Sequence, residues 1–238
     1  MSFNPSKCSV LRSCPSRSPI NSSYSIHNTT LQRSNVCKYL GVTISDDFKW
    51  SSHIATITKK ANQQLGFVRR NTRQLPRSFR EAAYKSLVRP HLEYCSSVWD
   101  PYTTSDTQKL EKIQRRAARY VTGDYKRCSS VTEMIKELEW PSLSERRTAG
   151  RLTMVYKILN GLVAIPPEEF FNRSTSRTRK NHNLTLLTYQ PRGNVDKFAF
   201  VQRSIPEWNK LPGSVVHANS LDHFQGLLLK HLSQAPVE

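Results

Sequence analysis

From Trp50 onward, apolar residues recur at the three- and four-residue spacing of an amphipathic helix, and this period limits the fold more than any other feature. A first helix is predicted from about Ser52 to Asn71. At about 100° per residue, its apolar positions fall within about 80° of one face. They are Ile54, Ile57, Ala61, Leu65 and Val68. Such a helix must bury this face against a neighbour.

A second amphipathic helix is predicted to end just before Gly123. Thr104 or Ser105 can cap its start, and Gly123 can close it in the left-handed conformation. Its apolar residues share an arc of roughly 80°. They are Leu110, Ile113, Ala117 and Val121. Both ends and one buried face of this helix are therefore predicted.

The helix expected between these two begins at Pro76, a residue suited to the first helical position. Because Pro90 interrupts an apolar pattern that continues beyond it, the helix should be kinked or divided there. The pattern comprises Tyr84, Leu87, Val88, Leu92, Cys95 and Val98. We expect this most apolar segment to lie at the centre of the core.

Two capping boxes mark further helices. One runs from Ser130 to Glu133. The other runs from Ser142 to Glu145 and opens a helix that should end near Asn160.

The two ends of the chain differ from this helical middle. Residues 1–37 are predicted as loop with short strands near Cys8–Arg12 and Tyr24–Ile26. Residues 183–190 and 197–205 alternate like strands around a turn, and a last helix should begin at Ser220. The predicted fold is mainly α: a helical bundle with a short N-terminal β portion and a small C-terminal β-hairpin plus helix. Expected domains are 1–50, 51–171 and 184–238, with 172–183 as a linker.

The charge is strongly positive, at +18, with 36 Lys and Arg against 18 Asp and Glu. Half of the excess lies in residues 38–123, which hold 16 basic and 7 acidic residues for a net charge of +9. So large an excess repels itself unless a polyanion lies near, and nucleic acid is the first partner to consider.

The two amphipathic helices carry this charge on their outward faces. Five basic residues in or after the first helix lie away from its apolar stripe: Lys59, Lys60, Arg69, Arg70 and Arg73. Five in the helix before Gly123 do the same: Lys109, Lys112, Arg115, Arg116 and Arg119. Glu111 is too little acid to neutralise this second run. We predict that these ten residues bind phosphates, although a solvated surface would show the same pattern.

Catalytic chemistry has little support in the sequence. Asp46 and Asp47 could hold metal ions, but no other carboxylate motif joins them, and a charge near a helix N-terminus is the simpler role. The histidines form no recognised motif, and His53 is expected to pack or cap. A possible zinc set fits no common spacing: Cys8, Cys14, His27 and Cys37. We expect no metal, no cofactor and no small-molecule substrate.

No stretch approaches the ~20 apolar residues that cross a bilayer, so no membrane partner is expected. The five cysteines are odd in number and scattered, which favours reduced thiols. An intracellular location, in nucleus or cytoplasm, follows as the expectation.

Seven stretches form a recognisable series along the chain: FNPSKC at 3–8, KYLGV at 38–42, WSSH at 50–53, LVRPHLEYCSSVWDP at 87–101, LEKIQRRAARYVTG at 110–123, LEWPSLSERR at 138–147 and IPEWNKLP at 205–212. Together they resemble the C-terminal third of LINE-type, non-LTR retrotransposon reverse transcriptases of the jockey-like and chicken-repeat-like branches. The resemblance spans nearly the whole chain and depends on all of these motifs in order.

The resemblance implies a role for two parts of the chain. Tyr39, Leu40 and Gly41 would correspond to the primer-grip hairpin, and the basic helices to the thumb that holds the template–primer duplex by its backbone. The family's catalytic Tyr/Phe-Ala-Asp-Asp turn precedes the FNPSKC-like segment, whereas Asp46 and Asp47 follow KYLGV. Mg²⁺ is therefore implied only for the intact family enzyme, and this chain is expected to be inactive as a polymerase.

The partner implied is RNA, an RNA–DNA hybrid or DNA duplex, bound through its backbone. Two alternatives remain open. The basic helices could bind an acidic protein partner, or the chain could be a mis-split exon of an intact, active reverse transcriptase.

Overall fold

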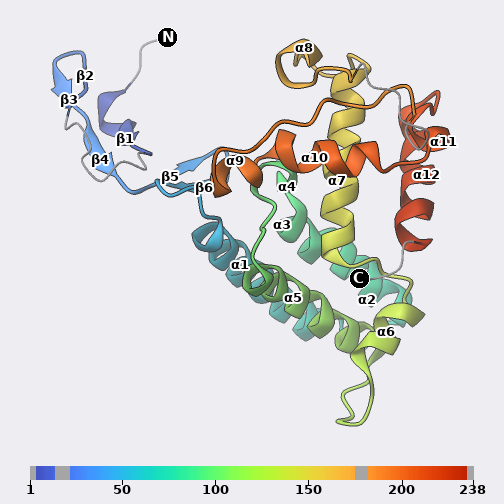
Figure 1. Cartoon of the computed structure of the whole chain (residues 1–238). Coiled ribbons are helices and arrows are strands. Elements are labelled where there is room, and N and C mark those ends of the chain that lie inside the picture. The colour runs from blue at the N-terminus through green and yellow to red at the C-terminus, as the bar shows by residue number, and fades with distance from the viewer. Residues whose placement is uncertain (1–3, 14–21, 175–181, 235–238) are drawn as a thin grey trace.

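The computed structural model describes residues 4–13, 22–174 and 182–234, and the chain in these ranges is mainly α-helical with short strands at its N-terminal side, as predicted (Figure 1). The long helices are α1 (Ser51–Thr72), α5 (Thr104–Thr122), α7 (Leu143–Leu159), α10 (Phe200–Asn209) and α12 (Leu221–Gln234). The shorter ones are η1 (Pro5–Lys7), α2 (Arg77–Ala83), η2 (Tyr84–Val88), α3 (Arg89–Glu93), α4 (Ser96–Trp99), α6 (Val131–Glu137), α8 (Pro167–Phe170), α9 (Asn194–Lys197) and α11 (Gly213–Val216).

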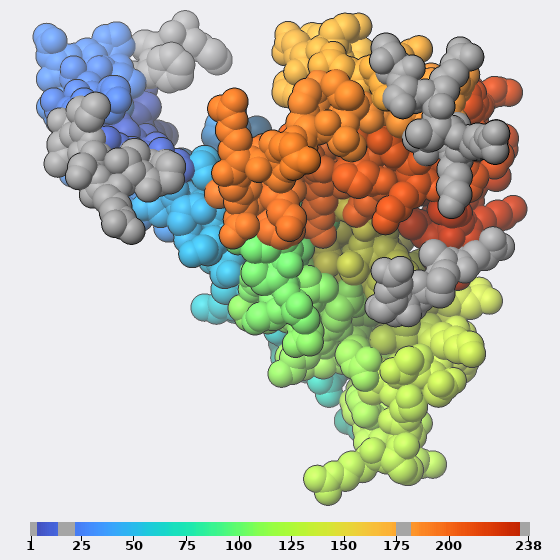
Figure 2. All heavy atoms as spheres, viewed as in Figure 1, coloured from blue at the N-terminus to red at the C-terminus, as the bar shows by residue number. Residues whose placement is uncertain are grey.

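Three two-stranded sheets precede α1. They pair β1 (Ser9–Leu11) in parallel with β4 (Gln32–Ser34), β2 (Ser25–Ile26) with β3 (Thr29–Thr30), and β5 (Val36–Tyr39) with β6 (Val42–Ser45). The strands expected near Cys8–Arg12 and Tyr24–Ile26 are confirmed as β1 and β2. Strands β1 to β4 project away from the helices, and β5 and β6 connect them to α1 (Figures 1 and 2).

Helices α1 and α5 lie side by side and run in the same direction. Hydrogen bonds join the two helices, and the bonded residues follow in the same order along both. Ser51 Oγ donates to Asp106 Oδ2 (2.6 Å), Arg116 Nη1 donates to Asn62 Oδ1 (2.8 Å), and the hydroxyls of Thr72 and Tyr120 bond to each other. Every apolar residue predicted for the inner faces of these two helices is buried.

The ends of α5 agree with the prediction to within one residue. Thr103 caps its start, just before the two residues predicted, and its side chain accepts from the backbone N–H of Asp106. Gly123 closes the helix at φ +76°, and its N–H donates to the carbonyl of Arg119.

The segment after Pro76 is divided, as predicted. It runs through α2, the π-helical η2, α3 and α4, with Pro90 in the first turn of α3 and Cys95 left-handed at φ +54° before α4. Tyr84, Val88 and Leu92 are buried in the core. The prediction was wrong for Leu87 and Val98, which are 47% and 55% exposed. The π-turn and the break at Cys95 rotate the later positions out of the helical register that the prediction assumed.

The buried apolar residues form two clusters. The first contains residues between Val42 and Leu143, from β6, α1 to α6 and the start of α7. The second contains residues between Leu152 and Leu228, from the rest of α7 and the C-terminal helices. Helix α7 therefore belongs to both clusters. Its start is fixed by the predicted capping box between Ser142 and Glu145, in which both hydrogen bonds are present.

A buried ion cluster lies where these two clusters meet. Arg147 and Arg151 of α7 are each 1% exposed, and both donate to the carboxylate of Asp100, which follows α4. Arg151 also pairs with Glu207 of α10 at 2.5 Å, and Arg203 of the same helix lies 3.3 Å from Asp100. The cluster therefore adds charged contacts among α4, α7 and α10 to the apolar contacts between α7 and α10.

The prediction of a C-terminal β-hairpin was wrong. Residues 194–197 and 200–209 are helices α9 and α10, and in the described part of 183–190 the structure shows one isolated bridge, between Leu186 and Arg173. Phe200 and Val201 are followed at helical spacing by Ser204, Ile205 and Trp208, and the last three are buried. A short apolar run fits the period of a strand as well as that of a helix. Only the continuation of the helical spacing to Trp208 shows that this segment is a helix. Within the predicted linker, residues 175–181 lie outside the described ranges.

Candidate nucleic-acid interface

The ten basic residues predicted to bind phosphates all lie at the surface of α1 or α5 or one residue beyond. Nine are exposed, and Arg119 is half-buried. At about 100° per residue, Lys59, Arg69 and Arg73 fall within about 60° of Asn62, and Arg70 within about 80°. Because Asn62 contacts α5, these four residues lie on the side of α1 that borders α5. Lys60 lies about 160° away, on the opposite side.

Helix α5 presents its basic residues toward the same border. Lys109, Lys112 and Arg119 fall within about 60° of Arg116, whereas Arg115 lies about 100° away. The structure thus brings eight of the ten residues onto adjoining sides of two parallel helices. We call these eight the basic surface: Lys59, Arg69, Arg70, Arg73, Lys109, Lys112, Arg116 and Arg119.

Several of these side chains already have partners within the chain. Lys109 pairs with Asp106 at 2.7 Å, and Arg119 donates to the carbonyl of Lys126 at 3.2 Å. For Lys59 and Lys112, the described residues offer no hydrogen-bond or ion-pair partner. Among the residues the structure describes, Asp106 is therefore the one carboxylate that forms an ion pair with any of the eight cations, and Asp124 lies near Arg119.

Asp106 is a neighbour of the basic surface that the sequence pattern did not reveal. It is buried in the first turn of α5, where Ser51, Thr103 and Lys109 donate to it. Burial raises the pKa of this carboxyl, but the hydrogen bonds from Lys109, Ser51 and Thr103 outweigh burial and the pKa is lowered. Asp106 therefore stays charged and ties α5 to the start of α1.

Glu111, the one acid inside the basic run of α5, is directed away from it. Its carboxylate accepts from the backbone N–H of Ser144 at the start of α7, at 2.9 Å. Burial raises its pKa, against the hydrogen bonds from the backbone of Ser144 and Leu143. Because the carboxylate of Glu111 bonds to the start of α7, it does not pair with the basic residues of α5.

The cations of the basic surface cover part of one turn of a nucleic-acid duplex. Lys59 and Arg73 are 14 residues apart, or about 21 Å at a rise of 1.5 Å each, and one turn of B-form duplex is about 34–36 Å. A duplex lying along the two helices could therefore meet these cations over rather more than half a turn.

The hairpin between β5 and β6 carries the residues that the resemblance placed at the primer grip. Leu40 and Gly41 form its two-residue turn with φ of +45° and +88°, as a type I′ turn requires. Tyr39 is 64% exposed and Leu40 is 73% exposed. Tyr94 donates through its hydroxyl to the carbonyl of Leu40 at 3.1 Å and fixes the tip. This tip lies near the start of α1, because the N–H of Thr43 donates to Nδ1 of His53.

Among the residues that the structure describes, the candidate metal ligands form no site. Asp47 accepts from Ser45 Oγ (2.7 Å) and from the backbone N–H of Lys49 (3.0 Å), and these hydrogen bonds lower its pKa. The described residues contain no group of three or more His, Cys, Asp or Glu able to hold a metal ion. Cys14, one of the candidate zinc ligands, lies outside the described ranges.

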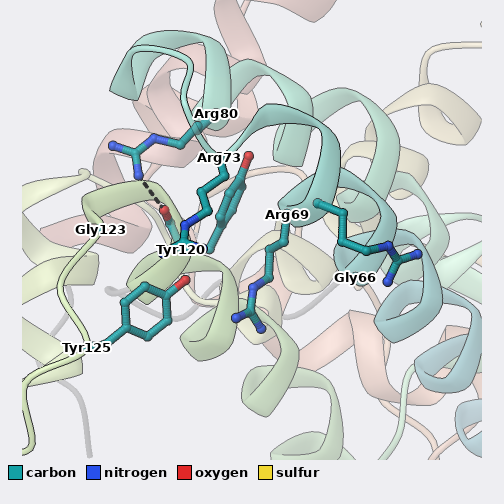
Figure 3. Close-up of a pocket in the computed structure, with 8 residues that line it drawn as sticks. Gly66, Arg69, Arg73, Arg80, Tyr120, Gly123 and Tyr125 are labelled. Carbon is teal, nitrogen blue, oxygen red and sulfur yellow. Dashed lines mark hydrogen bonds between the residues drawn. The ribbon is translucent and has the colours of Figure 1, made fainter.

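A hollow lies at the far end of the basic surface, where α1 and α5 both terminate (Figure 3). Its volume is about 860 Å³. It is lined by Gly66, Arg69, Arg70, Arg73, Arg80, Tyr120, Gly123 and Tyr125. The sequence predicted three of its arginines and missed Arg80 and both tyrosines. Tyr120 could have been found, because it lies within about 40° of Arg116 on the wheel of α5. Arg80 and Tyr125 come from outside both helices, and no periodicity includes them.

Among the described residues, no helix combines the length and the apolar character that crossing a bilayer requires. Comparisons with known proteins give short, weak matches. The Lin-9 homologs of human and of Macaca fascicularis are 28% identical to the chain over 118 residues, which are 46% of this chain and 21% of theirs. The probable RNA-directed DNA polymerase from transposon X-element of Drosophila melanogaster is 24% identical over 101 residues, 41% of this chain and 11% of that protein. The chain thus spans about a fifth or less of these relatives. No protein-family profile and no solved structure matches it.

Proposed function

We propose that this chain binds a nucleic-acid duplex through its sugar–phosphate backbone, with α1 and α5 lying along the duplex. The observation that carries the proposal is the basic surface: eight cations on adjoining sides of two parallel helices, of which only Lys109 forms an ion pair among the described residues. Phosphate contacts of this kind fix a protein on a duplex without reading its sequence. RNA, RNA–DNA hybrid and DNA duplexes all present such a backbone.

The role corresponds to the thumb of the LINE-type reverse transcriptases that the sequence resembles. The partial match to the polymerase of transposon X-element supports this origin. We propose that the chain derives from the duplex-gripping region of a mobile-element RNA-directed DNA polymerase, that it contributes no catalytic aspartates, and that it needs no metal to bind. The exposed hairpin at Tyr39–Gly41 would then face the primer strand near the start of α1.

The salt dependence of duplex binding tests this function. We would measure the affinity of the full chain for duplexes of several sequences by fluorescence anisotropy at increasing salt. Lys59→Gln with Lys112→Gln removes one cation from each helix, and neither side chain has a partner to lose among the described residues. Because counterion release contributes a slope of about −0.9 for each neutralised phosphate, the double variant should flatten the plot by up to about two units. All sequences should weaken alike.

The matched control is Lys210→Gln with Lys230→Gln. It removes the same charge from exposed positions on the C-terminal helices, so its slope should equal that of the parent. An unchanged slope in the Lys59/Lys112 variant would contradict the proposal. Polyglutamate that competes with duplex on equal terms would favour the acidic-partner alternative instead.

A further inference from the structure

The hollow at the end of the basic surface differs from a flat cationic face because it is concave and partly aromatic. Arg69, Arg70 and Arg73 enter it from the last turn of α1 and from the residue after it, and Arg80 enters from α2. Tyr120 and Tyr125 line it from the end of α5 and from the following loop (Figure 3). Elements far apart in the sequence therefore meet around one space.

The described residues that line the hollow include no carboxylate. Arg80 donates to the backbone carbonyl of Tyr120 at 2.9 Å, and the guanidinium of Arg69 lies 5.6 Å from the ring centre of Tyr125. The nearest acid along the chain, Asp124, accepts from the backbone N–H of Lys126 at 2.9 Å and is not part of the lining. Four guanidinium groups around one space repel one another, and an anion with several oxygen acceptors would relieve that repulsion.

The size and the aromatic wall indicate more than a single phosphate. About 860 Å³ lies within the range of sites that enclose a whole small molecule, roughly 300–1,000 Å³. The side chain of Tyr125 is 55% exposed, so part of its surface is free for a flat partner. Bases that are not paired stack on such aromatic side chains and on guanidinium planes, whatever their sequence.

The position of the hollow identifies the source of such a ligand. It lies at the end of α1 and α5, whereas the hairpin tip lies near the start of α1, a helix of 22 residues or about 33 Å. A strand that follows the basic surface therefore reaches the hollow where its contacts with the two helices stop. A base still paired in the duplex is stacked on both sides and cannot enter, whereas an unpaired base beyond the duplex end can.

We propose that the hollow holds an unpaired nucleotide at the end of the bound duplex, with its phosphate toward Arg70 and Arg73 and its base against Tyr125. This inference rests on the proposed function, because the basic surface brings the strand to the hollow. It adds a preference for a frayed or overhanging end that a purely backbone-directed surface would lack.

The test compares a blunt duplex with the same duplex carrying one unpaired, 5′-phosphorylated nucleotide. Base–aromatic stacking makes a bound base worth at least about a fivefold gain in affinity, and we expect a gain of that size or more. Tyr125→Ala should abolish the gain and leave blunt-duplex affinity unchanged, while Tyr125→Phe should retain it. The matched control is Tyr24→Ala, which removes a tyrosine that is 57% exposed on the N-terminal projection and should change neither affinity.

The possible outcomes distinguish a failure of this inference from a failure of the proposed duplex binding. Salt-dependent binding of blunt duplex with no gain from the overhang would overturn the inference and leave the proposed function standing. So would a Tyr125→Ala variant that weakens both duplexes equally. Loss of all salt-dependent binding to blunt duplex would overturn the function itself. Adenosine triphosphate that binds the chain through Tyr125, while the overhang brings no gain, would assign the hollow to a free nucleotide and overturn the strand-end proposal.

Discussion

Replacing Asp100 by Asn should destabilise the whole fold, because this carboxylate holds the buried ion cluster between the two apolar clusters. It accepts from Arg147 Nε at 2.8 Å and from Arg151 Nη1, and Arg203 Nη1 lies 3.3 Å away. The cluster contains three guanidinium groups and, with Glu207, two carboxylates. The substitution preserves the shape of the side chain but removes its charge.

The magnitude follows from what the substitution leaves behind. Arg151 keeps its bond to Glu207, but Arg147 loses its carboxylate partner while it is 1% exposed. Nη1 of Arg147 and Nε of Arg151 already lack a hydrogen-bond partner among the described residues, so these residues offer the site no spare acceptor. Removing one partner of a buried ion pair costs about 3–5 kcal/mol, most of it the penalty of an uncompensated buried charge. We expect Asp100→Asn to lower the free energy of unfolding by that amount.

Urea denaturation followed by far-ultraviolet circular dichroism would measure the loss. Glu137→Gln is the matched control: it removes one charge of the exposed Arg77–Glu137 pair, and such pairs contribute about 0–1 kcal/mol. An Asp100→Asn chain that unfolds within 1 kcal/mol of this control would refute the reasoning, since the arginines would then be shown to find water or another partner.

Two further substitutions test features of the first apolar cluster. His53 is buried, and burial lowers its pKa with a smaller effect from Lys60. Its neutral form therefore stabilises the fold above the unfolded pKa of about 6.5, and this stability is lost as pH falls through the folded pKa. Urea denaturation at pH 7.5 and 5.5 should show a fall in the free energy of unfolding of the parent and a smaller fall in His53→Gln. Equal falls in the two proteins would contradict this role of His53. Gly123→Ala should lower the free energy of unfolding by about 1–2 kcal/mol, because φ is +76° and the new Cβ would lie 3.2 Å from the Arg80 guanidinium. Thermal denaturation would measure it, and an unchanged midpoint would show that the helix end can relax.

Helices α1 and α5 were predictable because the signals that define them are local. A buried face shows in the spacing of apolar residues, and the closing residue Gly123 lies within one residue of the helix end. The basic residues opposite that face were predictable for the same reason. These signals also placed the start and end of α7, where Ser142 and Glu145 satisfy each other's backbone N–H groups.

The contacts between elements were not predictable from the same patterns. Asp106 looked like one polar residue in a first turn, yet it is buried and accepts from Ser51, 55 residues earlier. The hollow needs Arg80 from α2 and Tyr125 from a loop, and their approach depends on how α1 and α5 pack. Leu87 was misplaced because the π-turn at η2 shifts the helical phase by an amount that no sequence period reports.

The parallel register of α1 and α5 connects the fold to the proposed function. Hydrogen bonds fix that register at both ends, through Ser51 and Asp106 at the start and through Thr72 and Tyr120 at the finish. A helix is free to slide along a smooth apolar stripe, but polar pairs at two separated points allow one alignment only. That alignment places the cations of both helices along one border and brings both helix ends to the hollow. Stability therefore resides in the buried faces and the polar pairs. Lys59 and Lys112 are exposed and belong to neither, so their charge can be removed without disturbing the alignment of the two helices.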